Sequence, residues 1–247
     1  MKNFGLIGYP LGHSFSKKYF TEKFEKEGLN DCAYHLFALP NLKDFNAWLD
    51  DQNQLIGLNV TIPYKTEIIP FLDELSPQAE RIGAVNTIQW KAGKRIGHNT
   101  DYIGFKNSLV AFIGAKEMPN AALILGTGGA SKAVKAALED LNIAYTCVSR
   151  SARENTLSYE ELHQPNFDLK DYPLIINTTP LGMVPDVSSL PNLPYEQLST
   201  THMLYDLVYN PLQTAFMQKG IEAKCWVKNG LEMLQGQAEA AWGIWDS

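Results

Sequence analysis

The stretch LILGTGGASKAV, residues 123–134, joins an apolar run to a helix-like segment through closely spaced glycines. The run ends at Leu125, and Gly126, Gly128 and Gly129 follow it. Glycines let the backbone approach a pyrophosphate, and a helix N-terminus adds N–H donors and a positive dipole. The spacing departs from GxGxxG because the sixth position is Ser131. The stretch predicts a strand–turn–helix that binds a nucleotide, and the alternative is a tight turn that binds nothing.

The next apolar segment indicates which nucleotide would bind. Sites for NAD place Asp or Glu about 20 residues after the glycines, where the acid holds the ribose 2′-hydroxyl. Here the segment ends in CVSRSAR, with Ser149, Arg150, Ser151 and Arg153 in that place. Guanidinium groups bind phosphate in a bidentate fashion, which favours the 2′-phosphate of NADP(H) over NAD(H). For Arg153, a solvated loop charge is an equally good reading.

Strand-like and helix-like segments alternate on both sides of this stretch. Apolar segments at 121–126, 144–150, 172–180 and 202–210 are typical of parallel strands covered on both faces. The first hundred residues alternate in the same way, with Ser76 and Pro77 as a helix start and a hairpin around Ala92 and Gly93. The pattern predicts an α/β protein with a doubly wound sheet.

Composition narrows the function classes. The net charge is −6 with no basic cluster, so we expect no nucleic-acid partner. No run approaches the ~18 apolar residues of a membrane span, and the chain starts without a signal-like segment. The cysteines form no CxxC pair and the histidines no HxxxH pair, so we expect a reducing cytoplasm and no metal site.

Acid–base candidates follow two polar strand ends in the first half. Lys65 closes NVTIPYK (59–65), and Asp101 closes GHNTD (97–101). If the two are close, each favours the charged form of the other, and the lysine can exchange a proton with a hydroxyl or carbonyl oxygen. Asn59, Thr61, Asn86 and Asn99 add hydrogen-bonding groups. Ser14 and Ser16 precede a helix, which suits a carboxylate.

Eight segments, in order along nearly the whole chain, resemble the shikimate dehydrogenase family: GYPLGHSFSKKYF, GLNVTIPYK, GAVNT, HNTDYIGF, LGTGGASKAV, NTTPLGM, YDLVYNP and NGLEMLQGQ. The resemblance implies reversible, NADPH-dependent reduction of 3-dehydroshikimate to shikimate, in the pathway to chorismate and the aromatic amino acids. It also implies roles for individual residues. Lys65 and Asp101 would be catalytic; the substrate-binding residues would be Ser14, Ser16, Thr61, Asn86, Tyr209 and Gln237.

The cofactor residues implied by the resemblance lie in the second half. The pyrophosphate would contact Gly126, Thr127, Gly128, Gly129, Ala130 and Ser131; the 2′-phosphate, Ser149, Arg150, Ser151 and Arg153; and the nicotinamide end, Leu207 and Gly230.

Gln235 and Gln237 fall on opposite borders of the apolar stripe of the last helix, each roughly 80° from its centre, so helix geometry does not choose between them. The family pattern chooses Gln237. The family usually has glycine after the catalytic aspartate, where this chain has Tyr102, and the chain is short after Arg153.

We therefore expect two domains: an N-terminal α/β substrate-binding domain of residues 1–101 plus 231–247, and a Rossmann-type doubly wound NADP-binding domain of residues 102–230. The expected protein is a cytoplasmic monomer or homodimer that acts on a small molecule. The alternatives are a broader quinate/shikimate dehydrogenase and a ligand-binding regulator without turnover on the same fold.

Overall fold

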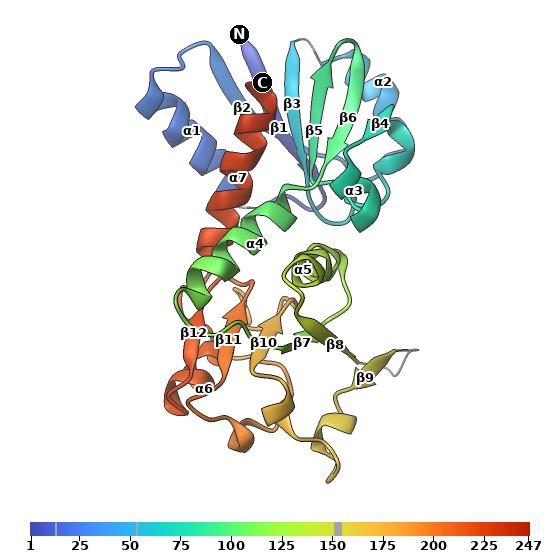
Figure 1. Ribbon diagram of the computed structural model, residues 1–247. Helices are drawn as coiled ribbons and strands as arrows, with labels where there is room; N and C mark the ends of the chain where they lie inside the picture. The colour runs from blue at the N-terminus through green and yellow to red at the C-terminus, as the bar shows by residue number, and fades with distance from the viewer. Residues whose placement is uncertain (13, 53, 151–154) are drawn as a thin grey trace. The chain divides into compact units, whose positions relative to one another are not determined.

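The chain divides into two compact units, one of residues Met1–Ile103 with Gln237–Ser247 and one of residues Gly104–Gly236 (Figure 1). Helices α4 (Thr100–Ile113) and α7 (Leu231–Trp245) carry the chain from one unit to the other. The computed structural model describes residues 1–12, 14–52, 54–150 and 155–247.

The second unit is built on a parallel sheet with the strand order β12-β11-β10-β7-β8-β9. Read from β9, this is the order 3-2-1-4-5-6 of dinucleotide-binding folds, so the predicted doubly wound sheet is confirmed. Its strands are β7 (Ala121–Leu125), β8 (Ala144–Ser149), β9 (Thr156–Ser158), β10 (Leu174–Asn177), β11 (Met203–Asp206) and β12 (Trp226–Lys228). The strand order reverses between β7 and β10, which is where such folds bind ligands.

Helices and short turns surround this sheet. They are α5 (Gly129–Asp140), α6 (Ala215–Glu222), and the 3₁₀ turns η2 (Glu161–His163), η3 (Leu169–Asp171) and η4 (Tyr195–Gln197). The central strands are buried because their residues are apolar throughout: Leu123, Leu125, Ile175 and Leu204 lie in one core cluster. The short edge strands β9 and β12 lack such a run, which is why the sequence pattern did not reveal them.

The first unit holds a mixed sheet with the strand order β2-β1-β3-β5-β6-β4, in which β3, β5 and β6 pair antiparallel. Its strands are β1 (Lys2–Gly8), β2 (Cys32–Ala38), β3 (Leu55–Val60), β4 (Glu74–Leu75), β5 (Thr87–Lys91) and β6 (Lys94–His98). The predicted hairpin around Ala92 and Gly93 joins β5 to β6. β3 ends at Val60, five residues before Lys65.

Helices cover both faces of this sheet. They are α1 (Phe15–Glu27), α2 (Phe45–Asp50), the 3₁₀ turn η1 (Ile69–Phe71) and α3 (Pro77–Ile82), together with the C-terminal part of α7. On one face, Phe20 and Phe24 of α1 and Ala241 and Trp245 of α7 pack against Phe4 of β1. The hydroxyls of Ser14 and Ser76 cap the starts of α1 and α3, as expected for these residues.

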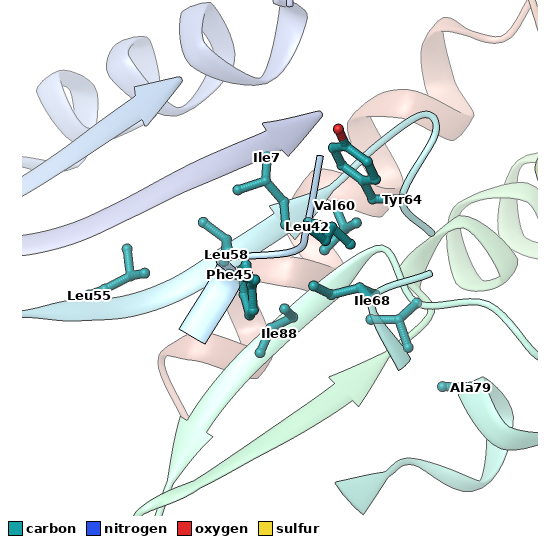
Figure 2. Close-up of a cluster of buried hydrophobic side chains, with 11 residues drawn as sticks. Ile7, Leu42, Phe45, Leu55, Leu58, Val60, Tyr64, Ile68, Ala79 and Ile88 are labelled. Atoms are coloured by element: carbon teal, nitrogen blue, oxygen red, sulfur yellow. The ribbon is translucent and has the colours of Figure 1, made fainter. Parts of the chain in front are cut away.

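A second apolar cluster on the other face fixes the chain on both sides of Lys65 (Figure 2). Tyr64 and Ile68 are both buried in it, against residues that include Leu58 and Ile88. The Tyr64 hydroxyl donates a hydrogen bond to the carbonyl of Leu39. The lysine therefore sits on a short loop whose neighbouring side chains belong to the core.

Across the described ranges, no helix combines the length and apolarity that a membrane span requires.

Leu58→Ala tests how much this core contributes to the stability of the protein. Leu58 is fully buried in β3, so its truncation is expected to lower the free energy of unfolding by about 2–5 kcal/mol. Ile62, four residues on, is 74% exposed, so Ile62→Ala is expected to change it by less than about 0.5 kcal/mol. Urea unfolding followed by circular dichroism measures both. Equal losses in the two variants would contradict this account of the core.

Candidate active site

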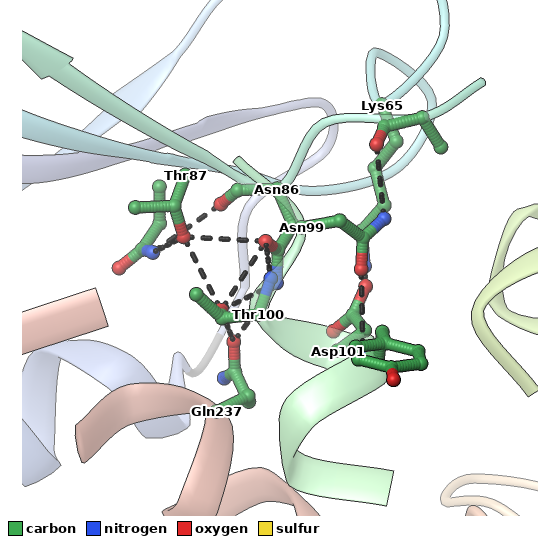
Figure 3. Close-up of polar contacts among 10 residues, drawn as sticks. Lys65, Asn86, Thr87, Asn99, Thr100, Asp101 and Gln237 are labelled. Atoms are coloured by element: carbon green, nitrogen blue, oxygen red, sulfur yellow. Dashed lines mark hydrogen bonds and ion pairs between the residues drawn. The ribbon is translucent and has the colours of Figure 1, made fainter. Parts of the chain in front are cut away.

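Lys65 and Asp101 form an ion pair in the first unit (Figure 3). The Lys65 Nζ atom lies 2.5 Å from Asp101 Oδ2, and the two side chains are 19% and 11% exposed. The residues are 36 positions apart in sequence, so the tertiary fold creates this contact. An ammonium group held at one position, partly shielded from water, can exchange a proton with a bound oxygen.

Backbone contacts hold both members of the pair. The Lys65 carbonyl accepts a hydrogen bond of 2.7 Å from the Val85 amide, just before β5. Asp101 lies in the first turn of α4, where a carboxylate interacts favourably with the helix dipole. The Asn99 side chain accepts from the Tyr102 amide at 3.1 Å, the pattern of an N-cap, and donates to the Ala84 carbonyl at 2.9 Å.

Asn86 is the centre of a buried polar cluster in the same unit (Figure 3). Its Nδ2 donates to Thr100 Oγ1 at 3.0 Å and to Gln237 Oε1 at 3.2 Å. Its Oδ1 accepts from the Thr100 amide at 2.7 Å and from Thr87 Oγ1 at 3.2 Å. Asn86 therefore joins the start of β5 to the start of α4 and to α7.

Gln237 and Gln235, which helix geometry left equivalent, have different surroundings. Gln237 is buried and contacts Asn86, whereas Gln235 is exposed. The other predicted substrate residues of this unit lie at the ends of helices and strands. Ser14 and Ser16 are half-buried at the start of α1, and Thr61 is half-buried directly after β3.

Tyr102, which stands where the family usually has glycine, is buried beside Arg81 of α3. The Arg81 guanidinium carbon lies 5.7 Å from the centre of the Tyr102 ring, within the range of a cation–π interaction. The larger side chain is thus accommodated by packing on α3.

In the second unit, the glycine turn lies at the reversal of strand order. Gly126 has φ +104°, a conformation that other residues rarely adopt, and a Cβ there would lie 2.9 Å from Thr178 Oγ1. Gly128 and Gly129 differ: a Cβ on either would meet no atom of the described residues within 4 Å. Ser131 is buried, and its hydroxyl donates to the Gly128 carbonyl at 2.7 Å.

These features fit a dinucleotide pyrophosphate. The open space beside Gly128 and Gly129 lies at the N-terminus of α5, where backbone N–H groups and the helix dipole favour an anion. Thr127 and Ala130 are half-buried members of the same turn. Ser149 is buried at the end of β8 and Arg150 follows it, exposed; Ser151 and Arg153 lie outside the described residues.

The remaining predicted residues of this unit lie beyond the end of β11. Gly230 approaches Leu207 so closely that a Cβ would lie 2.1 Å from the Leu207 carbonyl oxygen, so no larger residue fits. Tyr209 is half-buried, and burial raises the pKa of its phenol.

Sequence reasoning did not identify Asp206, which organises this region. Its Oδ1 accepts from Asn177 Nδ2 at 2.9 Å and from the Val208 amide at 3.0 Å, and its Oδ2 accepts from Thr214 Oγ1 at 2.6 Å. Asn177 also accepts from the hydroxyl of Thr179 at 2.6 Å. Burial raises the pKa of Asp206 to about 6, although these hydrogen bonds oppose the shift. The segments NTTPLGM and YDLVYNP contain these residues, but neither segment indicates their contacts.

The fold and these two sites define a two-unit α/β protein with a dinucleotide-type turn in one unit and a lysine–aspartate pair in the other. A family model described as the shikimate dehydrogenase substrate binding domain matches residues 6–88. Shikimate dehydrogenase (NADP(+)) of Methanococcus maripaludis strain C6 is 37% identical over 261 residues, covering 99% of this chain and 91% of that protein.

Solved structures of shikimate dehydrogenases are also similar to this chain. A shikimate dehydrogenase crystallised with NADP⁺ aligns with a TM-score of 0.86 at 34% identity, covering 99% of this chain and 89% of that one. The shikimate 5-dehydrogenase of Thermus thermophilus, in complex with NADP(H) and shikimate, aligns with a TM-score of 0.85 at 30% identity, covering 99% and 93%. The chain belongs to the shikimate dehydrogenase family.

The raised pKa of Asp206 predicts a pH dependence of stability. Its folded-state pKa of about 6 exceeds the ordinary value of 3.8, so the folded protein binds the proton more tightly than the unfolded chain. This contribution is fully present below pH 4 and is lost as pH rises through 6, by about 2–3 kcal/mol. The stability of the parent relative to Asp206→Asn should therefore fall between pH 4 and pH 7.

Urea unfolding of both proteins at pH 4, 5, 6 and 7 measures this difference. Comparing the two proteins cancels the other titrating groups. A difference that rises with pH, or stays constant, would contradict the assignment of a proton-binding group to Asp206.

Proposed function

We propose that this protein is an NADP-dependent shikimate dehydrogenase (EC 1.1.1.25), which reversibly reduces 3-dehydroshikimate to shikimate in the pathway to the aromatic amino acids. The observation that carries the proposal is the Lys65–Asp101 pair, which lies in the same unit as the buried Asn86–Gln237 contact in a member of this family. Relatives that carry this name cover the chain almost completely.

Bound NADPH would supply the hydride. The protein's own groups would transfer the proton and orient the substrate. The Lys65 ammonium would donate a proton to the alkoxide that develops from the C3 carbonyl, and take it back in the reverse direction. Asp101, in contact with Lys65, would hold the ammonium in place and accept a hydrogen bond from the C4 hydroxyl. Held in this way, the ammonium also stabilises the negative charge that develops in the transition state.

The remaining site residues would bind other parts of the substrate and the cofactor. Thr61, Asn86, Tyr209 and Gln237 would bind the ring hydroxyls, and Ser14 and Ser16 the carboxylate. The glycine turn would hold the pyrophosphate of NADP(H), which the free space beside Gly128 and Gly129 supports. Arg150 would bind the 2′-phosphate. The first unit would then be the substrate-binding domain and the second unit the cofactor-binding domain. We further propose a cytoplasmic monomer or homodimer without a nucleic-acid partner.

An assay of shikimate and quinate oxidation with NADP⁺ and with NAD⁺ tests the proposal. Oxidation of shikimate with NADP⁺ in clear preference to the other three combinations is expected. Comparable rates with quinate or with NAD⁺ would favour the broader quinate/shikimate dehydrogenase. Binding of shikimate without any turnover would favour a regulator.

Lys65→Ala should lower kcat by several orders of magnitude while the KM for shikimate stays near the parent value, as expected for an interaction made in the transition state. Lys26→Ala, an exposed lysine of α1, is the matched control. A kcat for Lys65→Ala within about threefold of the parent would exclude Lys65 as the proton-transfer group. If Asp101 acts through Lys65, the double variant Lys65→Ala/Asp101→Asn should be no slower than Lys65→Ala alone.

Alanine substitutions at two glycines of the same turn should affect different properties. Gly128→Ala places a methyl group in the open space, so it should raise the KM for NADP⁺ about tenfold or more while the free energy of unfolding changes by no more than about 1 kcal/mol. Gly126→Ala forces a strained backbone against Thr178, so its main effect should be a loss of about 1–3 kcal/mol of stability. An unchanged KM for NADP⁺ in Gly128→Ala would argue against pyrophosphate binding at this turn.

A further inference from the structure

The phenol of Tyr34 lies buried in the first unit, between α1 and the sheet. Its ring stacks on Phe20 with 4.7 Å between ring centres, and its hydroxyl donates to Asn59 Oδ1 at 2.7 Å. Ser16, one helical turn before Phe20, forms a further hydrogen bond with the Tyr34 oxygen. Tyr34 thus connects the predicted carboxylate-binding end of α1 to the centre of the sheet.

A second hydroxyl continues this connection. Asn59 Nδ2 donates to Thr87 Oγ1 at 3.1 Å, and Thr87 Oγ1 donates to Asn86 Oδ1 at 3.2 Å. Asn86 Nδ2 in turn donates to Gln237 Oε1 at 3.2 Å. All of these residues except Ser16 are buried.

The bonds run in one direction, from Tyr34 through Asn59, Thr87 and Asn86 to Gln237. An amide side chain can present either its oxygen or its NH₂ group to a neighbour, and only its partners decide which. Here the Tyr34 hydroxyl donates to the Asn59 oxygen, so the Asn59 NH₂ faces Thr87. Thr87 and the Thr100 amide direct the oxygen of Asn86 in the same way, and the Asn86 NH₂ then contacts the Gln237 oxygen. Among the residues that the structure describes, only the oxygen of the Gln237 amide has a hydrogen-bond partner, which leaves its NH₂ group as a donor for a ligand.

We propose that Tyr34 and Thr87 are positioning residues of the substrate site, which orient the amides of Asn86 and Gln237 toward the hydroxyl groups of the substrate without touching it themselves. The inference deepens the proposed function and rests on it.

The groups in this series of hydrogen bonds make the orientation of the Asn86 and Gln237 amides insensitive to pH. Burial raises the pKa of the Tyr34 phenol, so it keeps its proton and remains a donor across the range in which the enzyme works. The other links are amides and a threonine hydroxyl, which do not titrate in that range. Breaking one link leaves a buried polar group without its partner, which is the costly case for a hydrogen-bond network.

Tyr34→Phe and Thr87→Val each remove one hydroxyl while keeping the shape of the side chain. Each is expected to raise the KM for shikimate about tenfold and to change kcat by less than about threefold, while the KM for NADP⁺ stays within about twofold of the parent. Thr87→Ser keeps the hydroxyl and should restore the parent KM. Shikimate analogues lacking the C4 or the C5 hydroxyl provide a second readout, because at least one should lose less affinity in Tyr34→Phe than shikimate does.

Tyr205→Phe is the matched control. The Tyr205 hydroxyl is also buried and donates to Ser108 Oγ at 2.8 Å, but it lies in the second unit. Its loss should lower the melting temperature without altering the KM for shikimate. The positioning role is wrong if Tyr34→Phe keeps the parent KM for shikimate, if Thr87→Ser behaves like Thr87→Val, or if the analogues lose as much affinity as shikimate.

Calorimetric binding of shikimate to the same proteins separates this inference from the proposed function. A parent enzyme that neither binds nor oxidises shikimate overturns both. A parent that binds and oxidises shikimate, with Tyr34→Phe and Thr87→Val binding it equally well, overturns the positioning role alone.

Discussion

The buried amide of Asn86 is the constraint on which the first unit's site depends. Only 2% of Asn86 is exposed, so its donors and acceptors must find partners inside the protein. Those partners come from β5, from the start of α4 and from α7. Satisfying one side chain therefore brings together segments that are more than a hundred residues apart, and it does so next to the helix start that carries Asp101.

The second unit meets a comparable demand with a carboxylate. Asp206 is fully buried, and its carboxylate accepts hydrogen bonds from Asn177, Val208 and Thr214. Asn177 ends β10, Val208 follows β11 and Thr214 precedes α6, so Asp206 connects the ends of two strands to the start of a helix. Gly126 and Thr178 approach each other at the same edge of the sheet, where the order of strands reverses. A turn that needs glycine and a loop that needs a buried acid thus meet at the place where dinucleotide-binding folds hold their ligand.

Much of the fold could be predicted because its central strands are apolar throughout and its helices begin at recognisable caps. The run before Gly126 and the start at Ser76 are examples, and both are present in the structure. The short strands β4, β9 and β12 could not be predicted, since two or three residues carry no period and form only by pairing with a neighbour. Lys65 and Asp101 were recognisable as polar residues past strand ends, but helix periodicity alone could not separate Gln237 from Gln235.

The sequence by itself determined the alternation of strands and helices, the glycine turn, the absence of an acid at the end of β8 and the residue types available for proton transfer. These are local properties, set by side-chain chemistry and spacing along the chain. The tertiary structure alone decided that Lys65 meets Asp101, that Asn86 meets Gln237, and that Tyr34, Asn59 and Thr87 form one directed chain of hydrogen bonds. Such contacts arise because buried polar groups must pair with whatever the fold brings within reach, and spacing in the sequence carries no record of that choice.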